Sequence, residues 1–425
     1  MSQEINKAEK QDLSLVVQAI GTDLEHTQVR VVASANADML FHYWKVGHFI
    51  LYLQKKEGWG SKVIDNLSKA IRSKYPDKKG YSRRNIFYMC QFASAYPLEV
   101  LKEMDRIDRL LTTPTVEKVL SLTNELNQIV QQPVALIQAT ENQSNTIMQQ
   151  PVAQLEEVTE TLSTIYHCDI SQIEEIFKHS AIVRTNWASH VILLNSKLPL
   201  GECYWYITQA VANGWSRNVL QMQIESNLFA RQITTKKVSN FSVRLPKPQS
   251  DLANYLMKDP YIFDMMGQTD KMAERDIERQ LVSHITKYLL EMGSGFAFVA
   301  QQKHFEVGDS DFYADLILYN IPLHAYVVVE LKATPFKPEY MGQLNFYINV
   351  VDDTLRGEHD NKTIGLLLCN GGDKVVAQYA LSGYDQPIGV SDYQLSKAIP
   401  DNLKSALPTV EEVEEELSKI VDKNI

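Results

Sequence analysis

Two apolar stretches decide the fold of the C-terminal part of this chain: Phe312-Tyr-Ala-Asp-Leu-Ile-Leu-Tyr319 and Tyr326-Val-Val-Val-Glu-Leu-Lys332. Both are rich in β-branched and aromatic residues, which is typical of β-strands. The segment between them, Asn320-Ile-Pro-Leu-His324, is typical of a turn. The pattern therefore predicts a β-hairpin, and a symmetric hairpin would be centred between Pro322 and Leu323.

This hairpin would place two carboxylates face to face. In the symmetric register Asp315 lies directly opposite Glu330, and opposed side chains on one face are about 5 Å apart at Cβ. Glu330 and Lys332 are two residues apart on one strand, so they share that face. Two carboxylates on an otherwise apolar face repel each other and need a cation, and a divalent metal ion would serve.

Such a cluster suits phosphodiester hydrolysis, which uses hard cations held by oxygen ligands. We predict that Asp315 and Glu330 bind Mg²⁺ or Mn²⁺ and that the backbone carbonyl of Leu331 adds a ligand. Lys332 would orient or help to deprotonate the attacking water, or stabilise the developing charge. Glu278, on a helix expected from Lys271 to Met292, would reach the metal directly or through water; the alternative is a solvated helix position.

A helix expected from about Glu339 to Val351 follows the hairpin. It carries Gln343 and Tyr347 one turn apart on one face, where an amide and a phenol would hold a phosphate backbone. For Tyr347, packing in the core is the alternative interpretation.

The composition is that of an ordinary globular protein, with 425 residues and a net charge of −10. The N-terminus has no apolar signal-peptide region, and no apolar run is long enough for a membrane helix. Cys90, Cys168, Cys203 and Cys369 are scattered, which favours a reducing compartment over disulfides or a zinc site. We expect a cytoplasmic protein without membrane contact.

A local basic stretch stands out against the acidic whole. Between Lys55 and Arg84 ten basic residues face three acidic ones, which fits contact with phosphates or, equally, a solvated helix face. Within it, Gly80-Tyr-Ser-Arg-Arg-Asn-Ile86 resembles Gly214-Trp-Ser-Arg-Asn-Val-Leu220, which suggests either an internal duplication or two unrelated capped helices. The residues expected to bind nucleic acid are Lys78, Lys79, Arg83, Arg84 and Arg217.

The chain is expected to combine helical modules with an α/β domain, as a multidomain α + α/β protein. We predict an N-terminal helical module over residues 1–110, a low-complexity connector over 111–165, a second helical module over 166–240 and a mixed-sheet domain over 241–425. Within the last, strands are expected at 296–305, 312–319, 326–333, 363–369 and 375–380, an irregular linker at 239–260, and a helix from about 410.

The run Asp315…Glu330-x-Lys332 resembles the PD-(D/E)xK signature of restriction-endonuclease-like nucleases, and Gln343-x-x-x-Tyr347 is similar to an extra motif of RecB-type members. More closely, the chain resembles the bacterial YhcG family, through Val-Val-Glu-Leu-Lys, Phe-Lys-Pro-Glu-Tyr-Met-Gly-Gln-Leu-Asn-Phe-Tyr at 336–347, Lys-Asp-Pro-Tyr at 258–261 and Gly-Trp-Ser-Arg-Asn-Val-Leu at 214–220. The resemblance implies a nuclease domain with a mixed sheet flanked by helices. It also implies a winged-helix-like N-terminal module that binds or recruits DNA.

We therefore expect a metal-dependent DNA endonuclease of the PD-(D/E)xK type, directed to DNA by its N-terminal module. Two alternatives stay open: a non-catalytic DNA-binding or adaptor protein that retains the nuclease fold, and a nuclease for branched DNA or RNA. The sequence does not specify the preferred DNA structure, the protein partners, a homo-oligomer or a pathway such as genome defence or recombination.

Overall fold

The computed structural model describes residues 34–52, 62–76, 80–111, 114–131, 162–264, 291–293 and 295–396. Its contacts group the chain into two compact units. We call them the helical unit (residues 1–110 and 124–208) and the sheet unit (residues 111–123 and 209–425). The four domain boundaries expected from the sequence stay predictions.

The described part of the helical unit is built from helices. They are a helix over residues 34–52, α2 (Lys62–Lys74), α3 (Arg83–Ala95), α4 (Leu98–Leu110), α7 (Ile170–His179), η2 (Ala181–Arg184) and α8 (Trp187–Ser196). Helices α5 (Val116–Gln131) and α9 (Leu200–Ala212) each belong partly to this unit. The core is aromatic: the Trp44 ring lies 6.1 Å from Phe41 and 5.5 Å from Phe177. The indole N–H of Trp44 donates to the carbonyl of Tyr96 at 2.7 Å, so the buried ring leaves no unsatisfied donor there.

Helices α3 and α10 (Arg217–Glu225) start in the same way. Gly80 and Gly214 adopt positive φ of 101° and 60°. Two residues later, the hydroxyls of Ser82 and Ser216 accept from the N–H groups of Asn85 and Val219 at 3.2 and 3.3 Å. Ser82 and Ser216 are therefore the N-caps of their helices, and the two similar sequence motifs produce one local geometry. Both helices therefore begin with an arginine in the first turn.

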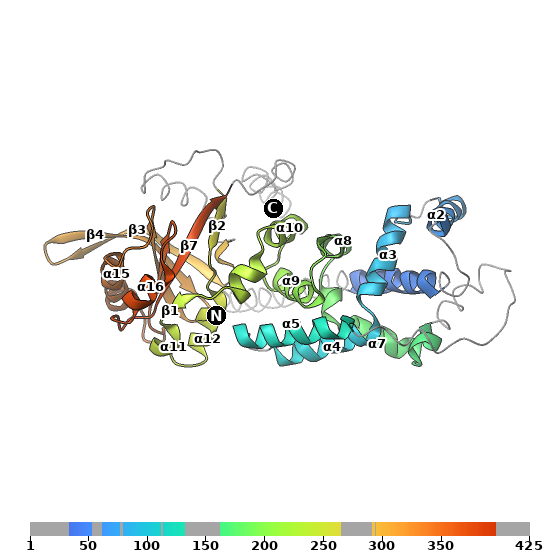
Figure 1. The fold of residues 1–425 in the computed structure, drawn as a ribbon, viewed down its shortest axis with the longest axis horizontal. Coiled ribbons are helices and arrows are strands. Elements are labelled where there is room, and N and C mark those ends of the chain that lie inside the picture. Colours follow the sequence, from blue (N-terminus) through green and yellow to red (C-terminus); the bar gives the residue numbers. More distant parts are fainter. Residues whose placement is uncertain are drawn as a thin grey trace, which may run out of the picture. The chain divides into compact units, whose positions relative to one another are not determined.

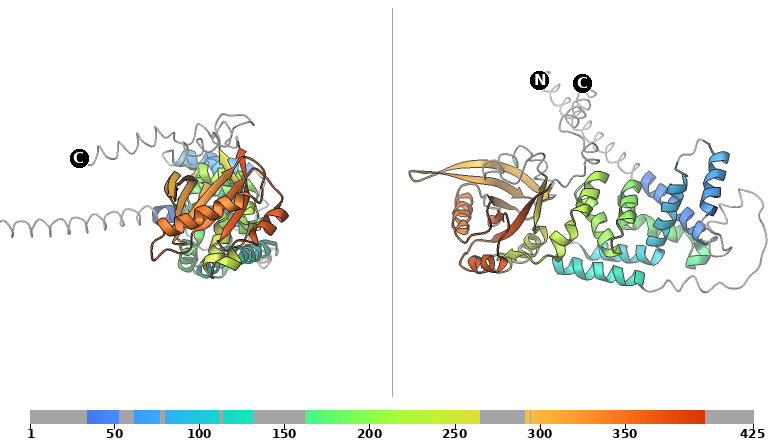
Figure 2. Two further views of the ribbon diagram at one scale, coloured as in Figure 1. Left: turned by 90° about the vertical axis from the view of Figure 1, so that its left-hand side faces the viewer. Right: turned by 45° about the horizontal axis from the view of Figure 1, so that its top comes forward.

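The sheet unit contains a seven-stranded mixed sheet. Its path runs β1 (Val238–Ser239), β7 (Ile388–Ser396), β6 (Ile364–Cys369), β5 (Ala325–Lys332), β4 (Ser310–Asn320) and β3 (Phe296–Val307), and β2 (Tyr261–Asp264) pairs with β7. Strands β5, β6 and β7 are parallel, whereas β3, β4 and β5 form an antiparallel meander. Beyond the sheet, β3 and β4 continue as a two-stranded arm (Figures 1 and 2). The expected mixed α/β architecture is confirmed.

The predicted hairpin register is confirmed. Leu316 pairs with Val329 and Asn320 with Ala325, which is the symmetric register centred between Pro322 and Leu323. His324 adopts φ of 46° in the turn. The tip of the arm is also the expected turn, since β3 ends at Val307 and Gly308 has φ of 62°.

The sheet has a core on each face. Val327, Val329 and Leu331 of β5 belong to one core, and Val328 belongs to the other. The Val328 core includes buried residues of α15 (Tyr340–Thr354) and α16 (Lys374–Leu381), which lie against the sheet in Figure 1. The other core includes residues of α11 (Phe241–Arg244) and α12 (Gln249–Leu256).

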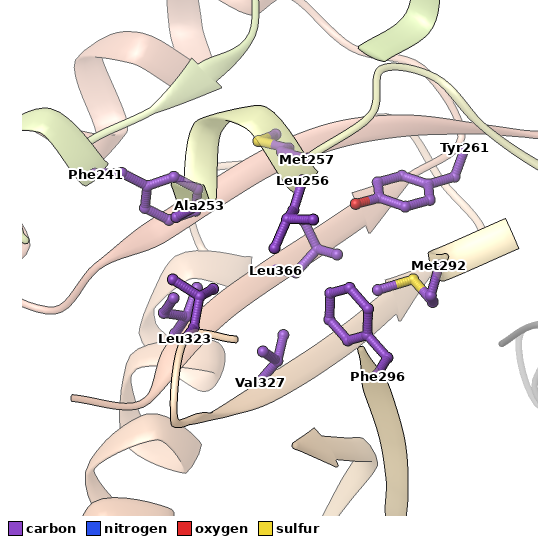
Figure 3. Close-up of a pocket in the computed structure, with 11 residues that line it drawn as sticks. Phe241, Ala253, Leu256, Met257, Tyr261, Met292, Phe296, Leu323, Val327 and Leu366 are labelled. Atoms are coloured by element: carbon purple, nitrogen blue, oxygen red, sulfur yellow. The ribbon is translucent and has the colours of Figure 1, made fainter. Parts of the chain in front are cut away.

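A cavity in the α11–α12 core is shown in Figure 3. Its lining is apolar, and includes Phe241, Met257, Phe296, Val327 and Leu366, with the hydroxyl of Tyr261 as a polar group. Because Glu330 and Lys332 alternate with the residues of this core along β5, they lie on the other face of the sheet. The cavity is therefore part of the core and lies away from the carboxylates.

Two expectations for secondary structure were wrong, and three strands, β1, β2 and β7, were missed. Residues 375–380 form helix α16, because the Asp373 carboxylate accepts from the N–H groups of Val375 and Val376 and caps a helix there. The linker expected at 239–260 contains α11 and α12, whose Phe241, Ala253 and Tyr255 are buried. The helix expected from Lys271 to Met292 lies outside the described residues except at its end, where Glu291 and Met292 are helical, and the helix expected from 410 lies outside them.

Part of the connector expected at 111–165 is well ordered. Helix α5 buries Val119, Leu122 and Leu126. Residues 132–161 lie outside the described residues. The sequence Gln-Gln-Pro-Val-Ala occurs twice here, at 131–135 and at 149–153.

The Lys-Asp-Pro-Tyr segment at 258–261 is linked by hydrogen bonds and an ion pair to β7 and to α16. Asp259 is 1% exposed, and its carboxylate accepts from the Ser391 hydroxyl at 3.1 Å and from the Asp392 N–H at 3.2 Å. Its second oxygen pairs with the ammonium group of Lys374 at the start of α16. One buried carboxylate therefore joins the segment before β2 to β7 and to α16.

Replacing Asp259 should destabilise the sheet unit. Asp259→Ala leaves the Asp392 N–H without this acceptor and the Lys374 ammonium without its partner, whereas the Ser391 hydroxyl can still donate to the Lys258 carbonyl at 2.8 Å. The variant should cost about 2 kcal/mol of unfolding free energy. Denaturant unfolding of the whole chain measures the loss. The control is Asp385→Ala, because Asp385 is 92% exposed and pairs with Arg244 at 2.8 Å, so its loss should cost under about 1 kcal/mol. Equal effects of the two variants would contradict this account of Asp259.

Candidate active site

Asp315 and Glu330 meet where the β4–β5 ladder ends. The last paired residues are Leu316 and Val329. One residue further on, hydrogen bonds between backbone N–H groups and side-chain carboxylates replace the backbone pairs. The Asp315 N–H donates to Glu330 Oε1 at 3.4 Å, and the Leu331 N–H donates to Asp315 Oδ2 at 3.0 Å. The local structure therefore binds each carboxylate to the strand that carries the other.

Burial makes this pair of charges costly. The Glu330 side chain is 0% exposed, and Asp315 is half-buried. Loss of water raises the pKa of Asp315, and the Leu331 N–H and the Lys332 ammonium only partly oppose this rise. Burial also raises the pKa of Glu330 far above its ordinary value, and the negative charge of Asp315 raises it further. Without a bound cation, the pair holds a proton at a pH where separate carboxylates would not.

Lys332 contributes the positive charge nearest to Glu330. Its Nζ lies 3.4 Å from Glu330 Oε2, and its side chain is 12% exposed. Glu330 Oε2 is buried and makes no hydrogen bond in the described part of the chain, so Lys332 approaches it as an ion and not with hydrogen-bond geometry. The same ammonium lies 5.6 Å from the centre of the Tyr340 ring, at cation–π distance. The Tyr340 hydroxyl in turn bonds to Thr334 Oγ1 at 2.6 Å.

Sequence reasoning gave no role to Tyr340 or to Gln302. Tyr340 is part of the Lys-Pro-Glu-Tyr run quoted above, but Phe336 is the first aromatic residue after the strand, so the sequence alone does not indicate that the Tyr340 ring lies near Lys332. Gln302, on β3, donates its Nε2–H to Asp315 Oδ1 at 3.1 Å. No sequence signal marks Gln302, because the β3 register decides which of its residues reaches Asp315.

The helix residues expected near the site have different surroundings. Gln343 is exposed on α15, whereas Tyr347 is buried in the core that α15 forms with the sheet. Val328 and Ile317 belong to the same core, so α15 covers the face that carries Asp315 and Glu330. Among the described residues, neither Gln343 nor Tyr347 makes a hydrogen bond to the carboxylates, and their roles stay predictions.

The chemistry of the cluster fits a divalent cation. It offers two opposed carboxylates, raised in pKa, and a buried oxygen of Glu330 without a hydrogen-bond donor. A hard cation would satisfy all three features. Of the other expected ligands, Leu331 touches the cluster through its N–H, its carbonyl stays a prediction, and Glu278 lies outside the described residues. Among the residues that are described, no third acidic, histidine or cysteine side chain completes a metal cluster.

The expected nucleic-acid contacts lie partly within the structure. Arg83 and Arg84 are exposed in the first turn of α3, and Arg217 is exposed at the first residue of α10. Lys78 and Lys79 lie outside the described residues. Arg83 pairs with Asp65 of α2 at 2.6 Å, and Arg84 lies 5.7 Å from the Tyr88 ring. None of the described helices is both long enough and apolar enough to cross a bilayer.

The raised pKa of Glu330 gives a prediction for stability. A carboxyl that holds its proton more tightly in the folded state stabilises that state fully below its unfolded pKa, and the stabilisation is lost as pH rises through the folded pKa. In EDTA, the melting temperature should therefore fall as pH rises above about 5. Glu330→Gln cannot ionise at this position, so its melting temperature should fall less than that of the wild type over the same pH range.

Thermal melts between pH 5 and 9 in EDTA test this directly. The matched control is Glu306→Gln, since Glu306 is an exposed carboxylate on β3 of the same sheet. A pH dependence that Glu330→Gln leaves as steep as in the wild type would show that the carboxylate pair is not the cause.

Residues 254–408 match the model of a domain described as the YhcG PDDEXK nuclease domain. Residues 19–124 match the model of the DUF1016 N-terminal domain. The first match contains Asp315, Glu330 and Lys332, and the second contains Arg83 and Arg84.

A curated relative from Escherichia coli (strain K12), described as a putative nuclease YhcG, is 28% identical over 203 residues. The aligned region covers 48% of this chain and 54% of the relative, so the chain spans about half the length of the protein that it matches. No solved structure matches the chain significantly.

Proposed function

Because the chain belongs to the YhcG family of PD-(D/E)xK nucleases, we propose that it is a metal-dependent endonuclease that hydrolyses phosphodiester bonds in DNA. The observation that carries the proposal is the opposition of Asp315 and Glu330 across the β4–β5 hairpin, with Lys332 beside them. The nuclease domain and the similar nuclease support the class of reaction. The metal, the substrate and the role of each residue are our proposals.

Asp315 and Glu330 would hold Mg²⁺ or Mn²⁺. When bound, the cation would supply Lewis-acid polarisation of the phosphate and of a water molecule. Glu330 is the better-shielded ligand, and its buried Oε2 has no hydrogen-bond donor among the described groups. Asp315 is held at both oxygens, by Gln302 and by the Leu331 N–H, so its carboxylate keeps one orientation.

Lys332 would act on the attacking water and on the phosphate. Its ammonium group stays close to Glu330 and over Tyr340, so its position is restricted before substrate binds. There it would stabilise the negative charge that develops when the water oxygen bonds to phosphorus and the bond to the leaving oxygen breaks. The exposed Gln343 would contact the phosphate backbone from α15.

DNA is the substrate that the helical unit favours. Helices α2 and α3 share a core, in which Leu67 and Ile71 pack with Ile86. We call their exposed cations the α2–α3 basic surface: Lys69, Arg72, Lys74, Arg83 and Arg84. Two exposed aromatic side chains, each 48% exposed, are close to these cations in the sequence: Tyr75 follows Lys74, and Phe87 comes three residues after Arg84. Cations and exposed rings together suit a phosphate backbone and its bases.

Variants of the carboxylate cluster test catalysis. Glu330→Ala and Lys332→Ala should each lower the rate of DNA cleavage in Mg²⁺ by at least about 10²-fold, because each removes a group that acts on the reacting phosphate or its cation. The rate is measured with plasmid, linear, branched and single-stranded DNA and with RNA. Glu358→Ala, at an exposed carboxylate of the same unit, is the control and should cleave like the wild type.

The pattern of cleavage separates the candidate functions. Cleavage of RNA or of branched DNA alone would replace our substrate by that one. A wild type that cuts nothing in Mg²⁺ or Mn²⁺ yet binds DNA would be a non-catalytic binding protein with a nuclease fold.

Variants of the α2–α3 basic surface test its contact with DNA. Arg83→Ala combined with Arg84→Ala should weaken DNA binding and lower the slope of log affinity against log salt by up to about 2, because each lost phosphate contact removes about 0.9. Binding is measured in EDTA at several salt concentrations, so that cleavage does not interfere. The control is Arg106→Ala with Arg109→Ala, since these exposed arginines of α4 pair with neighbouring acidic residues. The same loss of affinity in both double variants would show that α3 has no special contact.

A further inference from the structure

Gln302 occupies a backbone conformation that favours glycine. Its φ is +43° within β3, where strand residues have negative φ. A non-glycine residue in the left-handed region costs about 1 kcal/mol or more, and such residues gather at functional sites. The side chain at this position therefore has to contribute something that a glycine would not.

The side chain of Gln302 completes the support of Asp315. Its Nε2–H donates to Oδ1 at 3.1 Å, and the Leu331 N–H donates to Oδ2 at 3.0 Å. Two donors on the two oxygens fix the plane of the carboxylate. Each oxygen still has a second lone pair, which a cation can use.

Near Gln302 and Asp315, strands β3 and β4 change which of their side chains face the α15 core. Ala300 and Ile317 pack in the α15 core, and so do Phe305 and Ala314 further along the arm. Residues on one face of a regular strand are separated by even numbers, but here the separations are five and three. Both strands therefore change face between these positions, which is where Gln302 and Asp315 lie. Local irregularities of this kind re-aim side chains beside active sites.

We propose that Gln302 is a positioning residue that holds the Asp315 carboxylate in the orientation required to bind a divalent cation. The inference rests on the proposed metal-dependent function and deepens it. Gln302 acts through Asp315, and the left-handed backbone at Gln302 is what brings its amide to Oδ1. Residues that orient a metal ligand in this way usually contribute 10- to 100-fold to metal affinity.

Direct binding of Mn²⁺, followed by electron paramagnetic resonance without DNA, tests the inference apart from cleavage. Gln302→Gly keeps the favourable backbone and removes the donor, so its dissociation constant for Mn²⁺ should rise about 10- to 100-fold. Its melting temperature in EDTA should equal or exceed that of the wild type, because glycine accepts positive φ. Saturating metal should restore most of its cleavage rate, which separates a weakened metal site from a damaged fold.

Two further variants make the result decisive. Gln302→Met keeps the length of the side chain without its donor and should lose Mn²⁺ affinity to the same extent. His324→Gly removes another positive-φ side chain, at the β4–β5 turn, and should bind Mn²⁺ like the wild type. Unchanged affinity in Gln302→Gly or Gln302→Met would overturn the role of Gln302 and leave the proposed nuclease standing. A wild type that binds no Mn²⁺ at millimolar concentration would overturn both.

Discussion

The repulsion between Asp315 and Glu330 is the constraint on which the site depends. A buried face of a sheet normally carries apolar side chains, and here two acids meet where water is excluded. The surrounding groups oppose this cost only in part. Backbone N–H groups of residues 315 and 331, the Gln302 amide and the Lys332 ammonium each contact one of the carboxylates. What the protein leaves uncompensated is what a cation would supply, so instability without metal and the proposed affinity for metal would have the same origin.

The two faces of the sheet differ in composition: one carries only a core, and the other also carries the charged residues of the candidate site. The α11–α12 face is apolar throughout its core, and the α15 face carries the acids, the lysine and the helix that covers them. The buried Asp259 shows the contrast, because its carboxylate is fully engaged by Ser391, Asp392 and Lys374. Glu330 is just as buried but keeps an oxygen without a hydrogen bond. Burial alone therefore does not identify a site. At Glu330 it is combined with an opposed carboxylate, that of Asp315, and with an acceptor that has no hydrogen bond.

Local sequence patterns predicted the hairpin well because its register depends on neighbouring residues. Alternation, β-branched side chains and one short turn were enough to place Asp315 opposite Glu330. The same reasoning failed at Val375 and Val376, where an aspartate cap outweighs the strand preference of valine. It could not find Gln302, because the partner of Asp315 on β3 depends on a positive φ and a register shift within that strand. Long-range pairing and backbone irregularity are decided by the whole sheet.

The position of Asp315 on β4 means that the two turns of the meander should differ in how well they tolerate an inserted residue. The turn at Gly308 lies at the far end of the arm, so an extra residue there would lengthen a loop and leave the carboxylates opposed. The turn between Asn320 and Ala325 sets the pairing of β4 with β5. If an extra residue in this turn became part of β5, the register would shift by one residue and Glu330 would lie on the other face of the sheet. In a library of random insertions, the outer turn should accept new sequence, and the inner turn should reject it. The outer turn is therefore where a tag or a fused domain can be inserted without disturbing the chemistry.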